Sequence, residues 1–309
     1  MILYKGKVSK MAIRSTATQN PSATDTRTAQ HNRARRIVLL ILAYGVLGLI
    51  ALTSFYPLVM MIINSFKGDI EIILNPGGLP AHWTWQDYVQ LTTTQGNQLH
   101  NFFNSVLVSV ATTGISVFVA ALAAYAFAKM RFPGSGLIFF GLLATIMVPG
   151  ELRLPSLFLM FSQIDWINTY QVQIVPFLAS IFGLFMIRQY MLTIPDSLIE
   201  AARIDGANHW QIFWRIIVPV ASPILSAFAI LQFLGTWNSY LWPQVMANDP
   251  QVAPLMVTLP SLRDPILGYV PTYGVIMAGC VLATLPIVLI FLFFQDRFIT
   301  GVTLGATKE

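Results

Sequence analysis

The sequence predicts an all-α, polytopic membrane protein with six transmembrane helices. The first observation is composition: 55% of the 309 residues are hydrophobic and 10% are charged, whereas a soluble domain carries about 25% charged residues. A soluble fold of this size could not hide so much apolar surface. The second observation is that the apolar residues fall into six long charge-free runs, and the third is that the basic residues gather in alternate connections between these runs.

Each run has the roughly 20 apolar residues that a helix needs to cross a bilayer. In chain order, the expected spans are 37–66, 103–128, 132–150, 168–187, 216–246 and 273–294. Barrel strands are excluded, because they are about ten residues long and alternate apolar with polar residues. The prolines in these runs are compatible with membrane helices, since neighbouring helices satisfy the freed carbonyls. The first run is far longer than the apolar core of a signal peptide, which is about 7–15 residues.

The connections between the runs predict the orientation of the chain. Residues 1–36 are basic and rich in Ser and Thr, and we expect them to form a flexible cytoplasmic tail before the membrane domain of residues 37–309. In this orientation, 15 of the 18 Lys and Arg residues face the cytoplasm and 3 lie outside, which is a strong positive-inside bias. The net charge of +5 therefore reflects the orientation of the chain in the membrane. The tail lacks the basic surface with aromatic residues that is typical of a nucleic-acid-binding protein.

The most informative connection, residues 194–219, follows the fourth run. Pro195 ends the preceding helix, and either Asp196 or Ser197 is expected to cap a new, short amphipathic helix; Ser197 with Glu200 has the spacing of a capping box. Gly206 can adopt a positive φ and is expected to end that helix in a sharp turn. Two adjacent alanines in the helix permit the close approach of another surface, so the helix is a candidate docking element. The same pattern also fits an ordinary connecting loop with a good cap.

This connection resembles the EAA signature of permease subunits in ABC importers, which reads EAA, three residues, G, nine residues, I, one residue, L and P. Here the signature residues are Glu200, Ala201, Ala202, Gly206, Ile216 and Pro219, with Val218 in the leucine position. The stretch 201–207 is similar to the carbohydrate branch of the family, the MalG-like permeases. Segments 122–128, 237–243 and 295–308 also look like family segments, and the resemblance covers residues 37–309, although Glu309 stands where glycine is usual.

The resemblance implies the MetI-like permease fold in a bacterial inner membrane, with both termini cytoplasmic. It implies that the chain moves a sugar or oligosaccharide, with a second, MalF-like permease, two MalK-like ATPase subunits and an extracytoplasmic sugar-binding protein as partners. The chain is then not an enzyme and binds no cofactor or metal: it has no phosphate-loop motif, and ATP with magnesium binds to the partner ATPases.

The resemblance also implies which residues contact the ATPases. Coupling would rest on the connection between the fourth and fifth spans, through Glu200, Ala201, Ala202, Asp205, Gly206, Ala207, Ile216 and Pro219. A further contact would come from the C-terminal tail, through Gly301, Gly305 and Lys308.

The substrate path is less sharply defined by the sequence. Trp237, Asn238 and Tyr240 offer the aromatic and amide groups that hold sugars, but aromatic residues at a membrane boundary also form interfacial belts. Glu151 and Arg153 fit either a structural pair or a charged substrate. Glycerol phosphate transporters belong to the same branch of the family, and residues 147–153 resemble theirs slightly, so the resemblance also implies a glycerol phosphate importer as an alternative. A secondary transporter is disfavoured, because it would need ionisable residues inside the spans.

Overall fold

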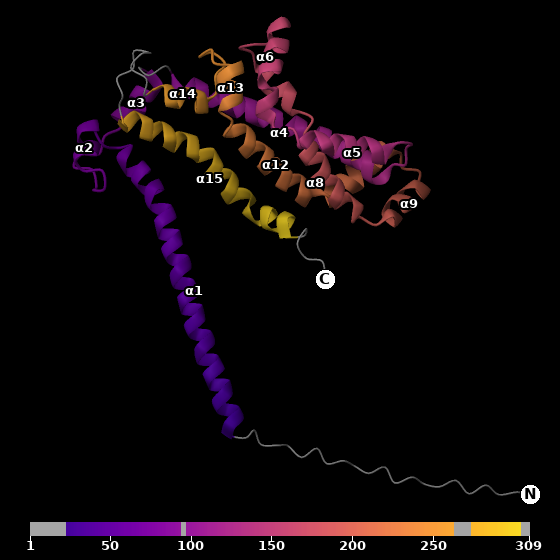
Figure 1. The fold of residues 1–309 in the computed structure, drawn as a ribbon, viewed down its shortest axis with the longest axis horizontal. Coiled ribbons are helices and arrows are strands. Elements are labelled where there is room, and N and C mark those ends of the chain that lie inside the picture. Colours follow the sequence, from indigo (N-terminus) through magenta and orange to yellow (C-terminus); the bar gives the residue numbers. More distant parts are fainter. Residues whose placement is uncertain (1–22, 94–96, 263–272, 304–309) are drawn as a thin grey trace, which may run out of the picture. The chain divides into compact units, whose positions relative to one another are not determined.

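The computed structural model describes residues 23–93, 97–262 and 273–303, and within these ranges the chain is helical, with no β-strand (Figure 1). The predicted all-α fold is confirmed. The chain divides into two units, residues 1–58 and residues 59–309.

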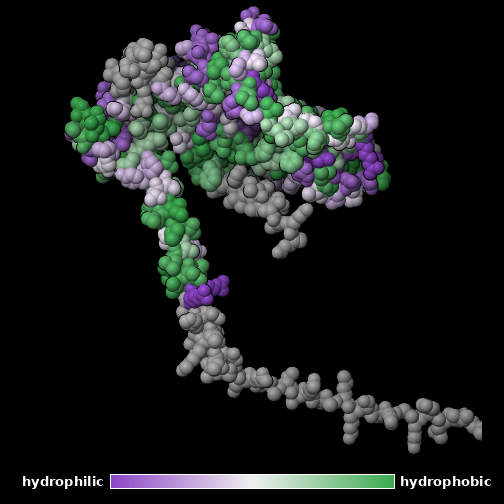
Figure 2. Space-filling view, in the orientation of Figure 1, coloured by the Kyte–Doolittle hydropathy of each residue, from purple (hydrophilic) through white to green (hydrophobic). Residues whose placement is uncertain are grey.

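The first unit consists of most of helix α1 (Ala23–Asn64). The helix begins at Ala23, so residues 23–36 are helical where we expected a flexible tail; residues 1–22 lie outside the described part. The large apolar side chains of α1 between Ile37 and Leu58 are exposed, and Figure 2 shows a hydrophobic surface on the face of this segment in view. A helix that is apolar all round and unburied suits a lipid environment.

The second unit contains the other spans. Across the described residues, α1 included, four helical segments are long and apolar enough to cross a membrane. The number rises to six if each of two bent helix pairs counts as one span. The segments of this unit are α4 (Gln98–Lys129), α5 (Ser135–Ile146) with η1 (Gly150–Arg153) and α6 (Leu154–Gln163), α7 (Tyr170–Ile174) with η2 (Val175–Phe177) and α8 (Ile181–Leu192), α10 (His209–Ile212) with η3 (Phe213–Ile217), α11 (Val218–Val220) and α12 (Ser222–Trp237), and α15 (Tyr273–Thr303).

Two expected spans are broken rather than straight. The chain bends by 90° between residues 135–146 and 150–163, and by 77° between residues 209–220 and 222–237. Pro149 stands at the first break, and Pro219 and Pro223 flank the second; proline removes a helical hydrogen bond and clashes with the preceding turn. The fifth span also ends at Trp237 rather than near residue 246.

Short helices make up the connections. They are α2 (Asp69–Leu74), α3 (Gln86–Thr93), α9 (Asp196–Ile204), α13 (Leu241–Met246) and α14 (Leu255–Ser261).

Helix α4 is the centre of the second unit. It packs against α8 and α12, and α12 packs in turn against α15 (Figure 1). One face of α4 carries small buried residues, namely Ser105, Ser109, Thr112, Ser116, Ala120 and Ala124, which allow close helix contact. Helices α8 and α12 pack tightly at Gly183, where a Cβ atom would lie 2.2 Å from the ring of Phe228.

The two ends of α4 contact different connecting segments of the chain. At its C-terminal end, Lys129 contacts the start of α9 through Asp196; we call this the α9 end. At its N-terminal end, the side-chain amide of Asn101 donates to the carbonyl of Ala253 at 2.9 Å, just before α14; we call this the α14 end. Because α4 has 32 residues, it is about 48 Å long, more than the thickness of a bilayer core.

A pair of carboxylates lies at the α14 end, beside the start of α15. Asp69 accepts a hydrogen bond from the backbone N–H of Gly274 at 3.0 Å. Asp87 is buried, and its Oδ2 has no hydrogen-bond partner among the described residues. Burial, followed by the charge of Asp69, raises the pKa of Asp87 from 3.8 to about 6.

Candidate functional site

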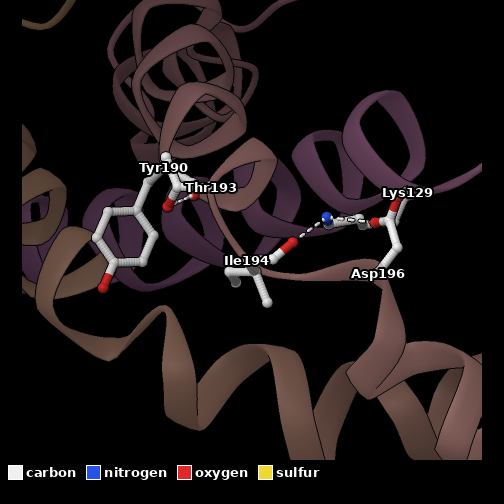
Figure 3. A network of polar contacts seen from close by, with 5 residues as sticks. All are labelled: Lys129, Tyr190, Thr193, Ile194 and Asp196. Carbon is white, nitrogen blue, oxygen red and sulfur yellow. Dashed lines mark hydrogen bonds and ion pairs between the residues drawn. The ribbon is translucent and has the colours of Figure 1, made fainter. Parts of the chain in front are cut away.

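The start of α9 is held by an ion pair that links it to α4. The side-chain nitrogen of Lys129 lies 2.7 Å from Oδ1 of Asp196 and donates a second hydrogen bond to the carbonyl of Ile194 at 2.5 Å. Figure 3 shows the Lys129 ammonium between these two oxygens. The Lys129 side chain is 3% exposed and that of Asp196 is 73% exposed. The hydrogen bond and charge of Lys129 hold the pKa of Asp196 below its ordinary value.

The expected capping box at Ser197 and Glu200 is wrong. Helix α9 begins at Asp196, and the residue before it, Pro195, makes no side-chain capping bond. Ser197 and Glu200 therefore lie inside the helix, where neither is placed to cap it. A capping box does occur one helix later, where Asn208 and Gln211 exchange hydrogen bonds of 2.9 Å at the start of α10.

The end of α9 has the turn that the sequence predicts. Gly206 adopts φ +81°, in the left-handed region that glycine enters without steric cost. The N–H of Gly206 donates to the carbonyl of Arg203 at 3.0 Å, and the N–H of Ala207 donates to that of Ala202 at 2.9 Å. These two bonds form a Schellman motif, which satisfies the last carbonyls of the helix.

One face of α9 packs on the core and the other is free. Ile199 and Ala202 are buried in the core cluster. Ala201, Glu200 and Asp205 are exposed, and Ile204 is 86% exposed. Figure 2 shows hydrophilic residues over α9. The helix is thus fixed to the core on one side and presents charged residues of both signs, Arg203 included, and apolar residues on the other.

The segment after α9 connects it to α12. His209 opens α10, and its Nδ1 lies 3.0 Å from the hydroxyl of Tyr125 on α4, at hydrogen-bonding distance. The chain then passes through a π-helical turn, η3, which contains Ile216; such turns often occur at functional sites. Pro219 follows, exposed, in α11, before the 77° bend into α12.

A polar groove of about 510 Å³ lies between α4 and α9. Its lining includes Lys129, Arg131, Asp196, Glu200, Arg203 and His209. The lining is rich in charge, with three cations and two carboxylates around one recess. The groove adjoins the exposed face of α9, so charged groups of both signs lie beside that face.

Two further cavities lie nearer the α14 end. The small cavity, about 250 Å³, lies between α4, α7, η2, α12 and α13, and its polar lining residues are Ser105, Ser109, Gln173, Gln232, Thr236 and Ser239. The large cavity, about 660 Å³, includes Glu151, Arg153 and Tyr240. The two cavities share Phe177, Gln232, Ser239 and Trp242, so they adjoin each other.

The three residues expected on the substrate path have different surroundings. Trp237 is 1% exposed and its indole N–H donates to the carbonyl of Ala283 at 3.0 Å, so its role is packing between α12 and α15. The side chain of Asn238 is exposed and donates to the carbonyl of Leu234 at 2.8 Å. Tyr240 lines the large cavity. The structure thus places only one of the three at a cavity.

Glu151 and Arg153 both line the large cavity, and these two described residues form no ion pair with each other. The structural pairing considered from the sequence is therefore absent. Of the expected tail contacts, Gly301 belongs to α15, while Gly305 and Lys308 lie outside the described residues. The search for groups of three or more potential metal ligands finds none in the described part of the chain.

Sequence reasoning missed the polar residues of the small cavity. Gln173 and Gln232 are 59 positions apart in the sequence and lie in runs that we selected only for the absence of charged residues. Their signal was available, because an amide inside a charge-free run is itself unusual. Their convergence depends on tertiary packing.

Known proteins resemble this chain over most of its length. The family described as "Binding-protein-dependent transport system inner membrane component" matches residues 116–303. The arabinooligosaccharides transport system permease protein AraQ of Halalkalibacterium halodurans is 34% identical over 84% of this chain and 93% of its own length. The sn-glycerol-3-phosphate transport system permease protein UgpE of Yersinia enterocolitica is 30% identical over 80% of this chain and 89% of its own.

Solved structures agree on the fold. A bacterial ABC transporter that imports the acidic polysaccharide alginate contains a chain that matches with a TM-score of 0.75 and 24% identity, over 86% of this chain and 98% of that chain. At this identity, the likeness shows the fold alone, and it confirms the expected permease architecture.

Proposed function

The chain belongs to the family of binding-protein-dependent transport system inner membrane components and is a multi-pass ABC importer permease; on that premise we propose that it moves a neutral sugar or oligosaccharide, driven by partner ATPases that act on α9. The substrate proposal is supported by the relative named for arabinooligosaccharides. It is also supported by the small cavity, whose described lining contains hydroxyl and amide groups and no charged side chain.

The observation that carries the coupling role is the contrast between the two faces of α9. Ile199 and Ala202 fix the helix to the core, while Glu200, Ala201 and Ile204 are free on its outer face. A helix with small residues on an exposed face lets another backbone approach closely. An ATPase surface that pushes on this face moves α9 as a rigid body, because packing and the Schellman turn oppose its bending.

A displacement of α9 by the ATPase is transmitted to the substrate cavities through consecutive helical segments. Helix α9 leads through α10, η3 and α11 into α12, and α12 supplies Gln232 to the lining of both cavities. The start of α9 is also tied to α4 by Lys129, and α4 supplies Ser105 and Ser109 to the small cavity. A displacement of α9 therefore acts on two walls of that cavity. This is the geometry of alternating access by rigid-body motion.

The proposed orientation places the α9 end in the cytoplasm, where ATPase subunits with bound ATP and magnesium would dock. It follows from the positive-inside bias, since Lys129, Arg131 and Arg203 all lie at this end. An extracytoplasmic binding protein would then deliver substrate at the α14 end, and a second permease would complete the pathway.

The test is uptake by the complete transporter. The chain would be co-expressed with candidate partner permease, ATPase and binding-protein subunits and reconstituted in proteoliposomes, with ATP on the side of the ATPase subunits and the binding protein on the opposite side. We expect ATP-dependent uptake of neutral oligosaccharides such as arabinotriose. Uptake of glycerol 3-phosphate with no sugar uptake would contradict the substrate proposal.

Glycerol phosphate is the second candidate, and one observation favours it. Arg153 lines the large cavity without an ion-pair partner among the described residues, and a free guanidinium is a good ligand for phosphate. The Yersinia relative is named for this substrate. Glu151 lines the same cavity and would repel a phosphate, which makes a neutral sugar the better supported substrate.

A further inference from the structure

We propose that the small cavity is a subsite for one neutral sugar ring, held by Gln173, Gln232, Ser109 and Ser239 against the rings of Trp242 and Phe177. This inference rests on the proposed function and locates its substrate on this chain. None of the four polar residues belongs to the path expected from the sequence.

The cavity is walled by groups that still have hydrogen-bonding capacity. Gln173 is 3% exposed; its amide N–H donates to the carbonyl of Val252 at 3.0 Å, and its Oε1 has no partner among the described residues. The side chains of Ser109, Gln232 and Ser239 likewise make no hydrogen bond within the described part of the chain. The Gln173 oxygen is the one of these groups that is buried without a partner among the described residues; because an unpaired polar atom is costly inside a membrane protein, its place in this lining marks a candidate functional site.

The aromatic side of the cavity is rigid. The indole N–H of Trp242 donates to the carbonyl of Val172 at 3.0 Å. The ring of Phe177 packs edge-on against it, with a centroid distance of 5.1 Å and an interplanar angle of 83°. The two rings therefore offer a fixed apolar surface opposite the amides and hydroxyls. Aromatic walls with a few convergent polar groups are typical of small-molecule sites.

The charge and size of the cavity define the ligand class. Its lining has no charged side chain, which disfavours an anion and favours a neutral polyhydroxy compound. Its volume of about 250 Å³ is just below the usual range of ligand pockets, about 300–1,000 Å³, and suits one ring rather than a chain. The adjoining large cavity of about 660 Å³ offers space for the remaining rings of an oligosaccharide.

Gly235 provides a sharp test, because it lines the small cavity and a Cβ atom placed on it would meet nothing within 4 Å. In the variant Gly235→Leu the Cβ atom collides with nothing, and we expect the rest of the side chain to occupy part of the cavity. The matched control is Gly141→Leu on α5, where a Cβ atom also meets nothing within 4 Å and which lines none of the three cavities. Both variants would be measured in the reconstituted complete transporter, with arabinotriose as the probe.

We expect Gly235→Leu to reduce arabinotriose uptake more than tenfold relative to Gly141→Leu, in complexes that assemble to the same level. Gln232→Leu, with Gln163→Leu as its control, should raise the KM for uptake about three- to tenfold, the equivalent of one hydrogen bond. If the wild-type transporter takes up arabinotriose and Gly235→Leu takes it up equally well, the subsite is refuted while the proposed function stands. A wild-type transporter that moves glycerol 3-phosphate and no sugar would overturn both.

Discussion

Replacing Gly206 by alanine should loosen the turn that ends α9 without disturbing its packing. Gly206 has φ +81°, and a Cβ atom on it would meet nothing within 4 Å. The cost is therefore that of holding an L-residue in the left-handed region, about 1–2 kcal/mol. Since 1.4 kcal/mol is a factor of ten in an equilibrium constant, the open form of the turn should become roughly 5- to 30-fold more populated.

Hydrogen exchange at the backbone N–H of Ala207 measures this change directly, because its bond to Ala202 closes the turn. Exchange in Gly206→Ala should accelerate by the same factor, and ATP-driven uptake should fall. Gly206→Asn is the matched control, since asparagine enters the left-handed region readily, and it should stay close to wild type. An unchanged exchange rate at Ala207 in the alanine variant would refute the reasoning.

Three further predictions follow from buried contacts. Gly183→Ala should destabilise the protein by about 1–3 kcal/mol, because its Cβ would lie 2.2 Å from Phe228; thermal unfolding should show the loss, and Gly183→Ala with Phe228→Leu should recover most of it. Lys129→Gln should uncouple ATP hydrolysis from uptake by releasing the start of α9, whereas Arg131→Gln, the same charge change in an exposed residue, should not; equal uptake by the two variants would count against the tether. Asp87 has a pKa raised to about 6, so folding favours its protonated form. The contribution of this group to stability is complete below pH 3.8 and is lost as the pH rises through about 6. In Asp87→Asn, the melting temperature should therefore depend less on pH across that range.

The spans were predictable because they depend on composition along the chain. A run of apolar residues must avoid water whatever it packs against, so α4 and α15 lie where their runs do. The bends were less predictable. Pro149 and the pair Pro219 and Pro223 were visible in the sequence, but membrane helices tolerate proline in straight spans as well, and neighbouring helices decide which outcome occurs.

Within the coupling loop, the local features were predicted and the long-range ones were not. The turn at Gly206 follows from the conformational freedom of one residue. The capping box was assigned to residues that lie inside α9, since the helix begins at Asp196, and the contact of Asp196 with Lys129, 67 positions earlier, was not foreseen. No spacing rule within residues 194–219 contains that partner. The small cavity was missed for the same reason.

Cross-linking at α9 tests the central claim, that this helix is where ATPase subunits act on the permease. In a Cys280→Ala background, Ile204→Cys places a thiol on the outer face of α9, where Ile204 is 86% exposed. Leu74→Cys is the control at the α14 end, at a residue that is 80% exposed. We predict that Ile204→Cys cross-links to the ATPase subunit in the assembled complex with a yield that changes when ATP is added, and that Leu74→Cys does not cross-link. An ATPase cross-link at Leu74→Cys and none at Ile204→Cys would contradict the account.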